Sequence, residues 1–169
     1  NLVTKGAKPV KVSPEKGIYR QPSFSPDGSR IVYVKEDGND HQGYTYTKDP
    51  GLYWIASSGG PSTMIKGEGD YPIFSRDGKR IIYQTGGGTK SLKSVKLDGS
   101  DERVLATLRN AFRLVPSPDE QWVAFAQAYK VYVAAMPQTG KPIELDSKSD
   151  NVPSSQLARD AGINIHWSA

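Results

Sequence analysis

Serine and aspartate recur together along this chain, and in a hydrolase they could supply a nucleophile and the carboxylate that orients its base. A serine nucleophile also needs a histidine to take its proton, and the sequence has 2 histidines, His41 and His166. Neither stands at a repeating distance from the serines, so the pattern does not predict a catalytic triad. The recurring pairs are Ser25 with Asp27, Ser75 with Asp77, and Ser117 with Asp119.

The two histidines and one glycine-rich run carry the remaining signals for chemistry. His41 lies in an oxygen-rich stretch, Glu36–Gly43, which lacks the regular alternation and the distal glutamate of a calcium-binding loop. Gly86–Thr89 joins two predicted strands and lacks the lysine of a phosphate-binding loop. His166 stands beside Trp167, where it would line a channel or complete a turn. We therefore expect no catalytic, cofactor-binding or metal-binding residue in this chain.

The composition excludes several classes of function. The chain of 169 residues has no cysteine, so neither a disulfide nor a cysteine-ligated metal site can form. The net charge is +4, but lysine and arginine are scattered and form no basic stripe with interleaved aromatic residues, so we expect no nucleic-acid partner. No apolar run approaches the length of a membrane span, so we expect no membrane insertion.

An internal repeat contains all the serine–aspartate pairs. The phrase Pro22–Gly28 returns as Pro72–Gly78, and a weaker copy runs over Leu114–Glu120. Aligned on their serines, and including a further start at Ser168, the copies are 50, 42 and 51 residues apart. These spacings are close to the roughly 40–50 residues of one β-propeller blade.

The turn inside each copy explains why its acidic residue recurs. Glycine accepts the positive φ of a tight hairpin, and aspartate can cap the turn with its side chain. Because propeller blades are packed radially, these carboxylates should lie in separate turns and not converge on one reaction centre. We therefore interpret the following as structural turn residues: Asp27, Gly28, Asp77, Gly78 and Asp119.

Short β-branched and aromatic runs follow each phrase, and no long stretch shows the 3.6-residue period of a helix. We therefore predict an all-β fold, a partial β-propeller of three four-stranded antiparallel blades with flanking single strands. The blades span 20–67, 68–109 and 110–163, after a lead-in at 1–19 and before the first strand of another blade at 164–169. The lead-in holds a leftover outer strand at Lys8–Val12. The predicted fourth strands of the three blades are Thr63–Lys66, Arg103–Leu108 and Pro142–Asp146.

The phrase resembles the TolB-type, WD40-like propeller repeat, whose signature is a Pro-x-Phe/Trp-Ser-Pro-Asp-Gly turn followed by a strand led by lysine or arginine. Arg30 and Arg80 hold the basic position. The third copy departs from the signature, with Glu120 in place of glycine and Pro116 in place of the aromatic residue. The resemblance covers residues 8–169 and implies a propeller. It implies no particular function, because such propellers serve many proteins.

A second resemblance, over residues 110–169, is to the propeller of large exported bacterial amidohydrolases; it rests on Pro116–Ala126, Val131–Leu145 and Leu157–Ala169. It implies a non-catalytic scaffold, access or interaction domain in a periplasmic or secreted protein, whose metal-dependent hydrolase barrel lies outside this chain. The alternative is a TolB-type cell-envelope module that docks another protein. A third class, a propeller enzyme such as an oligosaccharide lyase, would need clustered channel histidines.

Three blades with a single strand at each end fall short of the roughly 4–8 blades that close a propeller ring. We therefore expect the remaining blades and domains of a longer protein to cover the outer faces, and the chain alone to self-associate through them. Two long loops, 36–51 and 147–163, should share one face of the propeller and could contact a protein partner. The candidate interaction residues there are His41, Tyr44, Tyr46, Arg159 and Asp160.

Overall fold

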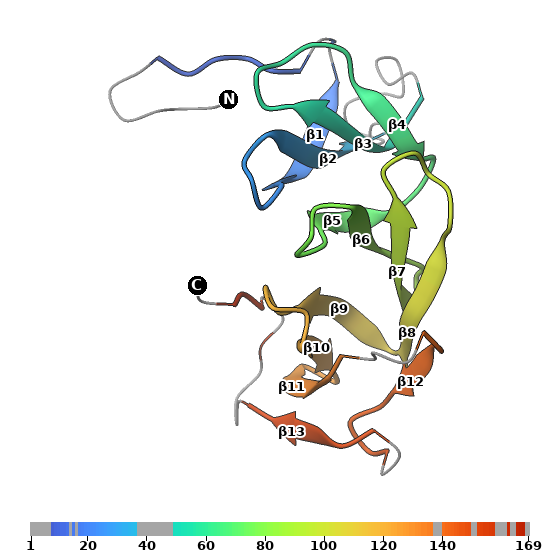
Figure 1. Ribbon diagram of the computed structural model, residues 1–169. Helices are drawn as coiled ribbons and strands as arrows, with labels where there is room; N and C mark the ends of the chain where they lie inside the picture. Colours follow the sequence, from blue (N-terminus) through green and yellow to red (C-terminus); the bar gives the residue numbers. More distant parts are fainter. Residues whose placement is uncertain are drawn as a thin grey trace. The chain divides into compact units, whose positions relative to one another are not determined.

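The computed structural model describes residues 8–13, 15, 17–36, 49–136, 140–149, 152–157, 162 and 165–167. Within these residues the chain consists of strands joined by turns and loops, with no helix. The predicted all-β class is therefore confirmed. The strands form three sheets (Figure 1), and the chain divides into two compact units, 1–83 with 95–101 and 84–94 with 102–169.

The first sheet lies in the first unit and follows the chain, in the order β1-β2-β3-β4. All its neighbouring strands are antiparallel, so it is a simple meander. A β-bulge between Arg20 and Ser23 interrupts the pairing of the first two strands. The strands are β1 (Ile18–Phe24), β2 (Arg30–Glu36), β3 (Gly51–Ala56) and β4 (Thr63–Lys66).

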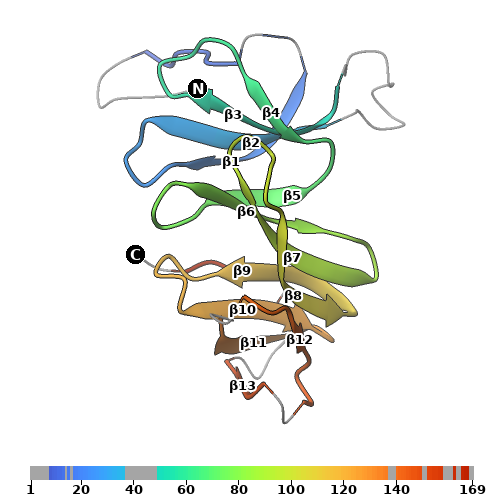
Figure 2. The same ribbon diagram turned by 45° about the vertical axis from the view of Figure 1, so that its right-hand side comes forward.

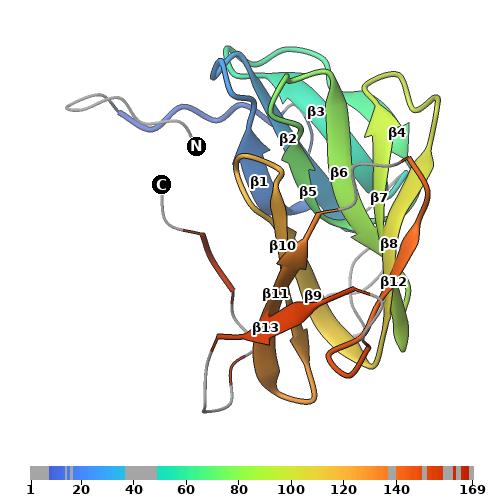
Figure 3. The ribbon, with the colours of Figure 1, turned by 60° about the horizontal axis from the view of Figure 1, so that its bottom comes forward.

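The second sheet has five strands in the order β12-β8-β7-β6-β5. The edge strand β12 comes from far along the chain and runs parallel to β8, with Leu145 opposite Leu108. Figures 1 and 3 both show these two strands side by side. The strands are β5 (Asp70–Phe74), β6 (Arg80–Thr85), β7 (Thr89–Lys96), β8 (Arg103–Arg109) and β12 (Ile143–Leu145).

The third sheet has the order β13-β11-β10-β9 and is antiparallel throughout (Figure 2). Its outer strand is not the predicted Pro142–Asp146 but a later segment, so that prediction was wrong. Leu145 and Leu108 are both buried, and β12 covers the outer edge of β8, whose backbone groups would otherwise be open to solvent. The strands are β9 (Ala111–Pro116), β10 (Trp122–Gln127), β11 (Lys130–Ala135) and β13 (Ser154–Gln156).

The predicted flanking strands are much reduced. In Lys8–Val12 only Val10 forms an isolated β-bridge, and residues 165–167 lie outside any strand. Ile165 is nevertheless buried, where it packs with Ala124 and Ala126 of β10.

Alternation along the strands sends side chains to opposite faces of each sheet. In the first unit, Val32, Val34 and Leu52 leave one face of the first sheet and pack with Phe74 and Tyr83 of the second. This cluster is the main core of the first unit. The residues between them in sequence leave the opposite face of the first sheet.

Candidate functional site: the tyrosine face of the first sheet

The recurring serines and aspartates build the turn between the first two strands of each sheet. In the first turn, the Ser25 hydroxyl donates to Asp27 Oδ1 at 2.5 Å and accepts the backbone N–H of Arg30 at 2.9 Å. The same carboxylate oxygen accepts the backbone N–H of Ser29 at 3.0 Å. Gly28 completes the turn with a φ of 71°. The hydroxyl that could have been a nucleophile thus donates and accepts within its own turn.

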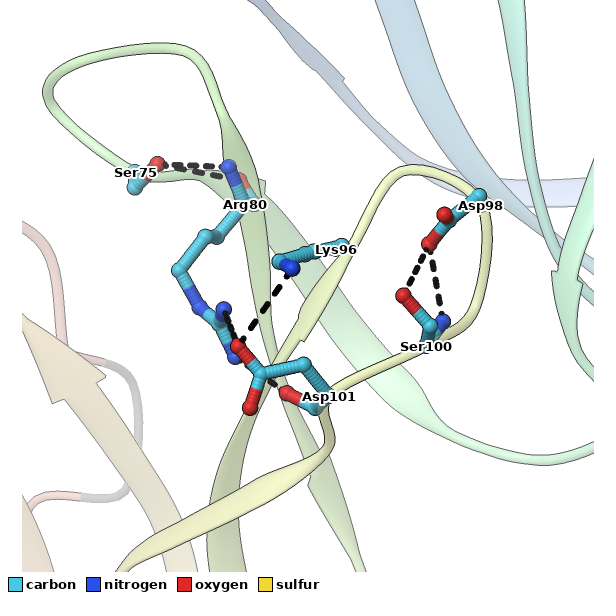
Figure 4. Close-up of polar contacts among 6 residues, drawn as sticks. All are labelled: Ser75, Arg80, Lys96, Asp98, Ser100 and Asp101. Atoms are coloured by element: carbon cyan, nitrogen blue, oxygen red, sulfur yellow. Dashed lines mark hydrogen bonds and ion pairs between the residues drawn. The ribbon is translucent and has the colours of Figure 1, made fainter.

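The second turn repeats this arrangement. The Ser75 hydroxyl donates to Asp77 Oδ1 at 2.7 Å and accepts the backbone N–H of Arg80 at 2.9 Å (Figure 4). Gly78 has a φ of 69°. Ser75 is 6% exposed, so these bonds are made away from bulk water.

The third turn keeps the geometry although its sequence departs from the signature. The Ser117 hydroxyl donates to Asp119 Oδ1 and accepts the backbone N–H of Trp122 at 3.0 Å. Glu120 takes the position of the glycine with a φ of 58°, a left-handed conformation that a residue with a Cβ adopts at a cost. Serine and aspartate therefore shape this turn without the help of glycine.

Hydrogen bonding in the turns lowers the pKa of their carboxyl groups. The Ser25 hydroxyl, followed by the backbone and side chain of Ser29, holds the pKa of Asp27 at about 2. The Ser75 hydroxyl and the backbone N–H of Lys79 likewise lower the pKa of Asp77. Both carboxylates are ionised at neutral pH, where they act as acceptors inside separate turns.

A charged network locks the hairpin between β7 and β8 (Figure 4). The Arg80 guanidinium donates to the Asp101 carboxylate at 2.8 Å and to its backbone carbonyl at 2.5 Å. Lys96 Nζ lies 3.9 Å from the same carboxylate. Beside them Asp98 Oδ1 accepts the backbone N–H of Ser100 at 2.9 Å and its hydroxyl at 2.6 Å. These hydrogen bonds and ion pairs join β6 to the hairpin formed by β7 and β8.

The other residues singled out from the sequence do not form a site in the described structure. His166 is exposed, while the neighbouring Trp167 donates its indole N–H to the Val115 carbonyl at 3.0 Å. Among the described residues, no three His, Asp or Glu side chains come together as metal ligands would. Five predicted interaction residues lie outside the described residues: His41, Tyr44, Tyr46, Arg159 and Asp160.

Three tyrosines gather on the face of the first sheet opposite the core of the first unit. The rings of Tyr19 and Tyr33 meet edge to face at 5.4 Å, and those of Tyr33 and Tyr53 stack at 6.0 Å. Ile31 and Ile55 continue this cluster; both isoleucines, Tyr33 and Tyr53 are buried, and Val12 packs against them. We call Tyr19, Ile31, Tyr33, Tyr53 and Ile55 the tyrosine face.

A lysine is folded into the tyrosine face. Lys35 Nζ lies 5.5 Å from the ring centre of Tyr53 and pairs with Glu15 Oε2 at 3.1 Å. Burial alone would lower the pKa of Lys35, but the hydrogen bond and charge of Glu15 outweigh it and raise the pKa. Burial also raises the pKa of Tyr19, Tyr33 and Tyr53. The face thus contains neutral tyrosines and one charged, paired lysine at neutral pH.

Two hollows open on the tyrosine face. One has a volume of about 440 Å³ and is lined by its tyrosines together with Lys35 and Asp49. The other has about 260 Å³ and is lined by Val12, Phe24 and the isoleucines. The larger volume is near the lower end of the range for ligand pockets, and the smaller one, which is mainly apolar, is below that range.

The repeat provides an internal comparison for this face. Phe24 and Phe74 occupy the same position, directly before the turn serine, yet Phe24 is 51% exposed and Phe74 is 7% exposed. Phe74 is covered because it packs on Val32, Val34 and Leu52 of the first sheet. Phe24 has no such sheet over it among the described residues. The aligned phenylalanines are visible in the repeat, but their different exposure depends on which sheet packs over each and is not predicted by the sequence.

No protein-family model and no curated protein matches this chain. Solved structures do match. A structure assigned as TolB from Agrobacterium tumefaciens aligns with a TM-score of 0.56 and 22% identity, over 89% of this chain and 53% of that one. The chain has a β-propeller fold. The propeller domain of the trilobed protease from Pyrococcus furiosus, which has an open velcro topology, aligns at 0.55 and 12% identity over 87% of this chain and 45% of its own.

An oligogalacturonate lyase in complex with manganese also aligns, with a TM-score of 0.55, 16% identity, and coverage of 84% of this chain and 36% of the lyase. At these identities the likeness establishes the propeller fold alone. The chain spans about half the length of the TolB structure and less of the other two propellers. Among the described residues no helix has the length and hydrophobicity to cross a membrane.

Proposed function

We propose that this chain is a TolB-like propeller segment that serves as an interaction and scaffold domain within a larger exported protein, and that its tyrosine face is covered there by a further blade. The observation that carries the proposal is the unequal exposure of the equivalent residues Phe24 and Phe74. In the second repeat this position is buried by the sheet before it. The same apolar position in the first repeat favours the same kind of partner.

The chemistry of the tyrosine face supports a sheet as that partner. Ile81 and Tyr83 of β6 are the repeat equivalents of Ile31 and Tyr33, and both pack in the core with side chains of the first sheet. The tyrosine face thus presents the residue types that the second sheet buries against its neighbour. Four members of the face are already buried, so the apolar side chain still exposed beside it is Phe24, which lines the smaller hollow.

Alkylation of a single introduced cysteine tests this assignment, because the natural chain has no cysteine. In Phe24→Cys the thiol should react rapidly in this chain alone, and about tenfold or more slowly in the longer polypeptide that contains a covering blade. Trp122→Cys, at a 48% exposed aromatic position on β10, is the matched control and should react at similar rates in both. Equal rates at Phe24→Cys in both proteins would contradict the proposal.

The chain alone should also pair through the same face. We expect light scattering to show a dimer that grows with concentration, and Phe24→Asp to shift the sample toward monomer because a carboxylate would be buried in the contact. Trp122→Asp should leave the association unchanged. A strictly monomeric chain at about 1 mM, a concentration at which even millimolar contacts form, would count against the open face.

The proposed host is an exported amidohydrolase, and the alternative is a TolB-type cell-envelope protein. The resemblance of residues 110–169 to amidohydrolase propellers favours the first, and the alignment with TolB is compatible with the second. A cluster of metal-ligand histidines in the rest of the open reading frame, with bound metal and hydrolase activity in the full protein, would support the hydrolase. Binding to peptidoglycan-associated lipoprotein without hydrolysis would support the TolB type. Recovery from the cytoplasmic fraction would contradict both.

A further inference from the structure

Two exposed aromatic side chains stand together in the second unit. Phe112 of β9 is 44% exposed and Tyr129, in the turn between β10 and β11, is 61% exposed. Their ring centres are 5.0 Å apart and the planes are tilted by 44°. Exposure of two adjacent aromatic rings to water is unfavourable, and a ligand that stacks on them would remove part of that exposed apolar area.

The turn that presents Tyr129 is strained. Gln127 pairs with Lys130, so the loop has two residues, and these have φ angles of 49° at Ala128 and 63° at Tyr129. A hairpin turn with two positive φ angles favours Asn-Gly, and a residue with a Cβ costs about 1 kcal/mol or more there. Strain of this kind is often retained at functional positions. Here it aims an aromatic ring at solvent.

A buried glutamine fixes the floor beneath the aromatic pair. The Gln127 side chain donates to the Arg109 carbonyl at 3.0 Å and accepts the backbone N–H of Ser147 at 2.9 Å. It therefore ties the end of β8, the end of β10 and the segment after β12 to one another. A site whose walls are held in this way is preorganised for a ligand.

Residues of these segments, together with Phe112 and Tyr129, line an open hollow of about 420 Å³. Phe112 and Tyr129 form its apolar wall, and Asp146, Ser147 and Lys148 its polar wall. Asp146 Oδ1 accepts the backbone N–H of Lys148 at 2.9 Å, which orients the carboxylate. The one acidic and one basic side chain in the lining balance in charge.

From this geometry we infer that the hollow between Phe112, Tyr129 and Asp146 binds a neutral saccharide. A sugar ring has an apolar C–H face that fits an aromatic wall, and hydroxyls that both donate and accept. Those hydroxyls match the carboxylate of Asp146 and the ammonium group of Lys148, two residues of the lining. A charge-balanced lining disfavours an ionic ligand, and the nearby Arg109 is already paired with Glu144 at 3.2 Å. The inference does not depend on the covering blade proposed above.

Titration of the ¹⁵N-labelled chain with maltose, cellobiose and N,N′-diacetylchitobiose tests the inference. At least one of these sugars should shift the amide signals of Phe112, Tyr129 and Ser147, with saturation near about 10 mM if the dissociation constant is about 1 mM. Tyr129→Ala should weaken binding roughly three- to tenfold, and Tyr129→Phe should retain most of it, because the ring and not the hydroxyl provides the stacking.

Further variants separate the polar contacts from the fold. Asp146→Asn can keep the acceptor for the backbone N–H of Lys148 but loses the negative charge. It should weaken sugar binding by roughly three- to tenfold, while the amide signals remain those of the folded chain. Trp122→Ala removes an exposed aromatic side chain at the far end of β10 and should leave binding unchanged. Shifts that persist in Tyr129→Ala, no shifts with any of the three sugars, or preferential binding of oligothymidine at the same amides would overturn the inference.

Discussion

Replacement of a single turn hydroxyl should reveal how much of the fold depends on the repeated phrase. In Ser75→Ala, the backbone N–H of Arg80 loses its 2.9 Å acceptor and Asp77 loses its 2.7 Å donor. The serine is 6% exposed, so water replaces the lost bonds poorly. We expect the free energy of unfolding to fall by about 2 kcal/mol, because leaving a buried polar group without a partner costs about 1–3 kcal/mol.

The sign of the pH dependence follows from the pKa of Asp77, which the Ser75 hydroxyl lowers. A carboxyl group with a lowered pKa in the folded state stabilises the fold above its unfolded pKa, and this contribution is lost as the pH falls through the folded value. The variant lacks part of this contribution. The difference between the two proteins should therefore be largest at neutral pH and smaller at acidic pH below the folded-state pKa, where the carboxyl is protonated in both.

Urea unfolding and calorimetry at several pH values measure this effect, and the melting temperature of the variant should be lower by about 4–8 °C at neutral pH. Ser100→Ala is the matched control, since that exposed hydroxyl bonds only within the β7–β8 hairpin; it should cost less than about 1 kcal/mol. An equal loss in both variants, or a Ser75→Ala difference that grows on acidification, would refute this account of the turn.

Three other changes have outcomes of similar clarity. Phe74→Ala should cost about 3–5 kcal/mol and Phe24→Ala less than about 1 in the isolated chain, because only the first empties a packed core; equal losses would contradict the exposure difference. Gly69→Ala should destabilise the fold by about 3 kcal/mol, because the φ of Gly69 is 138° and a Cβ would lie 2.6 Å from a ring carbon of Tyr83. An unchanged melting temperature by circular dichroism would contradict this. The free energy of unfolding of the first unit should fall as the pH rises through the raised pKa values of Lys35 and the tyrosines. A free energy of unfolding in urea that does not change with pH in the alkaline range would contradict this.

The repeat made the turns predictable because their chemistry is local. The turn serine and aspartate bond to each other and to backbone N–H groups no more than five residues after the serine, and the structure shows the serine–aspartate bond in all three copies. Even Glu120 follows the pattern, since two of the three local determinants remain.

The assignment of the fourth strand of the third blade failed because strand pairing is not local. Pro142–Asp146 has the composition of a strand, but nothing in five residues says whether β8 or β11 will be its neighbour. The same limit hid the aromatic pair: Phe112 and Tyr129 come from different segments, and the turn residues Ala128 and Tyr129 carry none of the usual turn signals.

The parallel pairing of β12 with β8 affects how the chain can fold while it is being synthesised. The backbone edge of β8 is complete only when Ile143–Leu145 has been synthesised, after all of β9, β10 and β11. A nascent chain synthesised only as far as Arg109 therefore has an unpaired strand edge at β8, which can pair wrongly with other chains. Translation must supply more than 30 further residues before that edge is closed. At roughly 5–20 residues per second, the exposure lasts on the order of seconds on each ribosome.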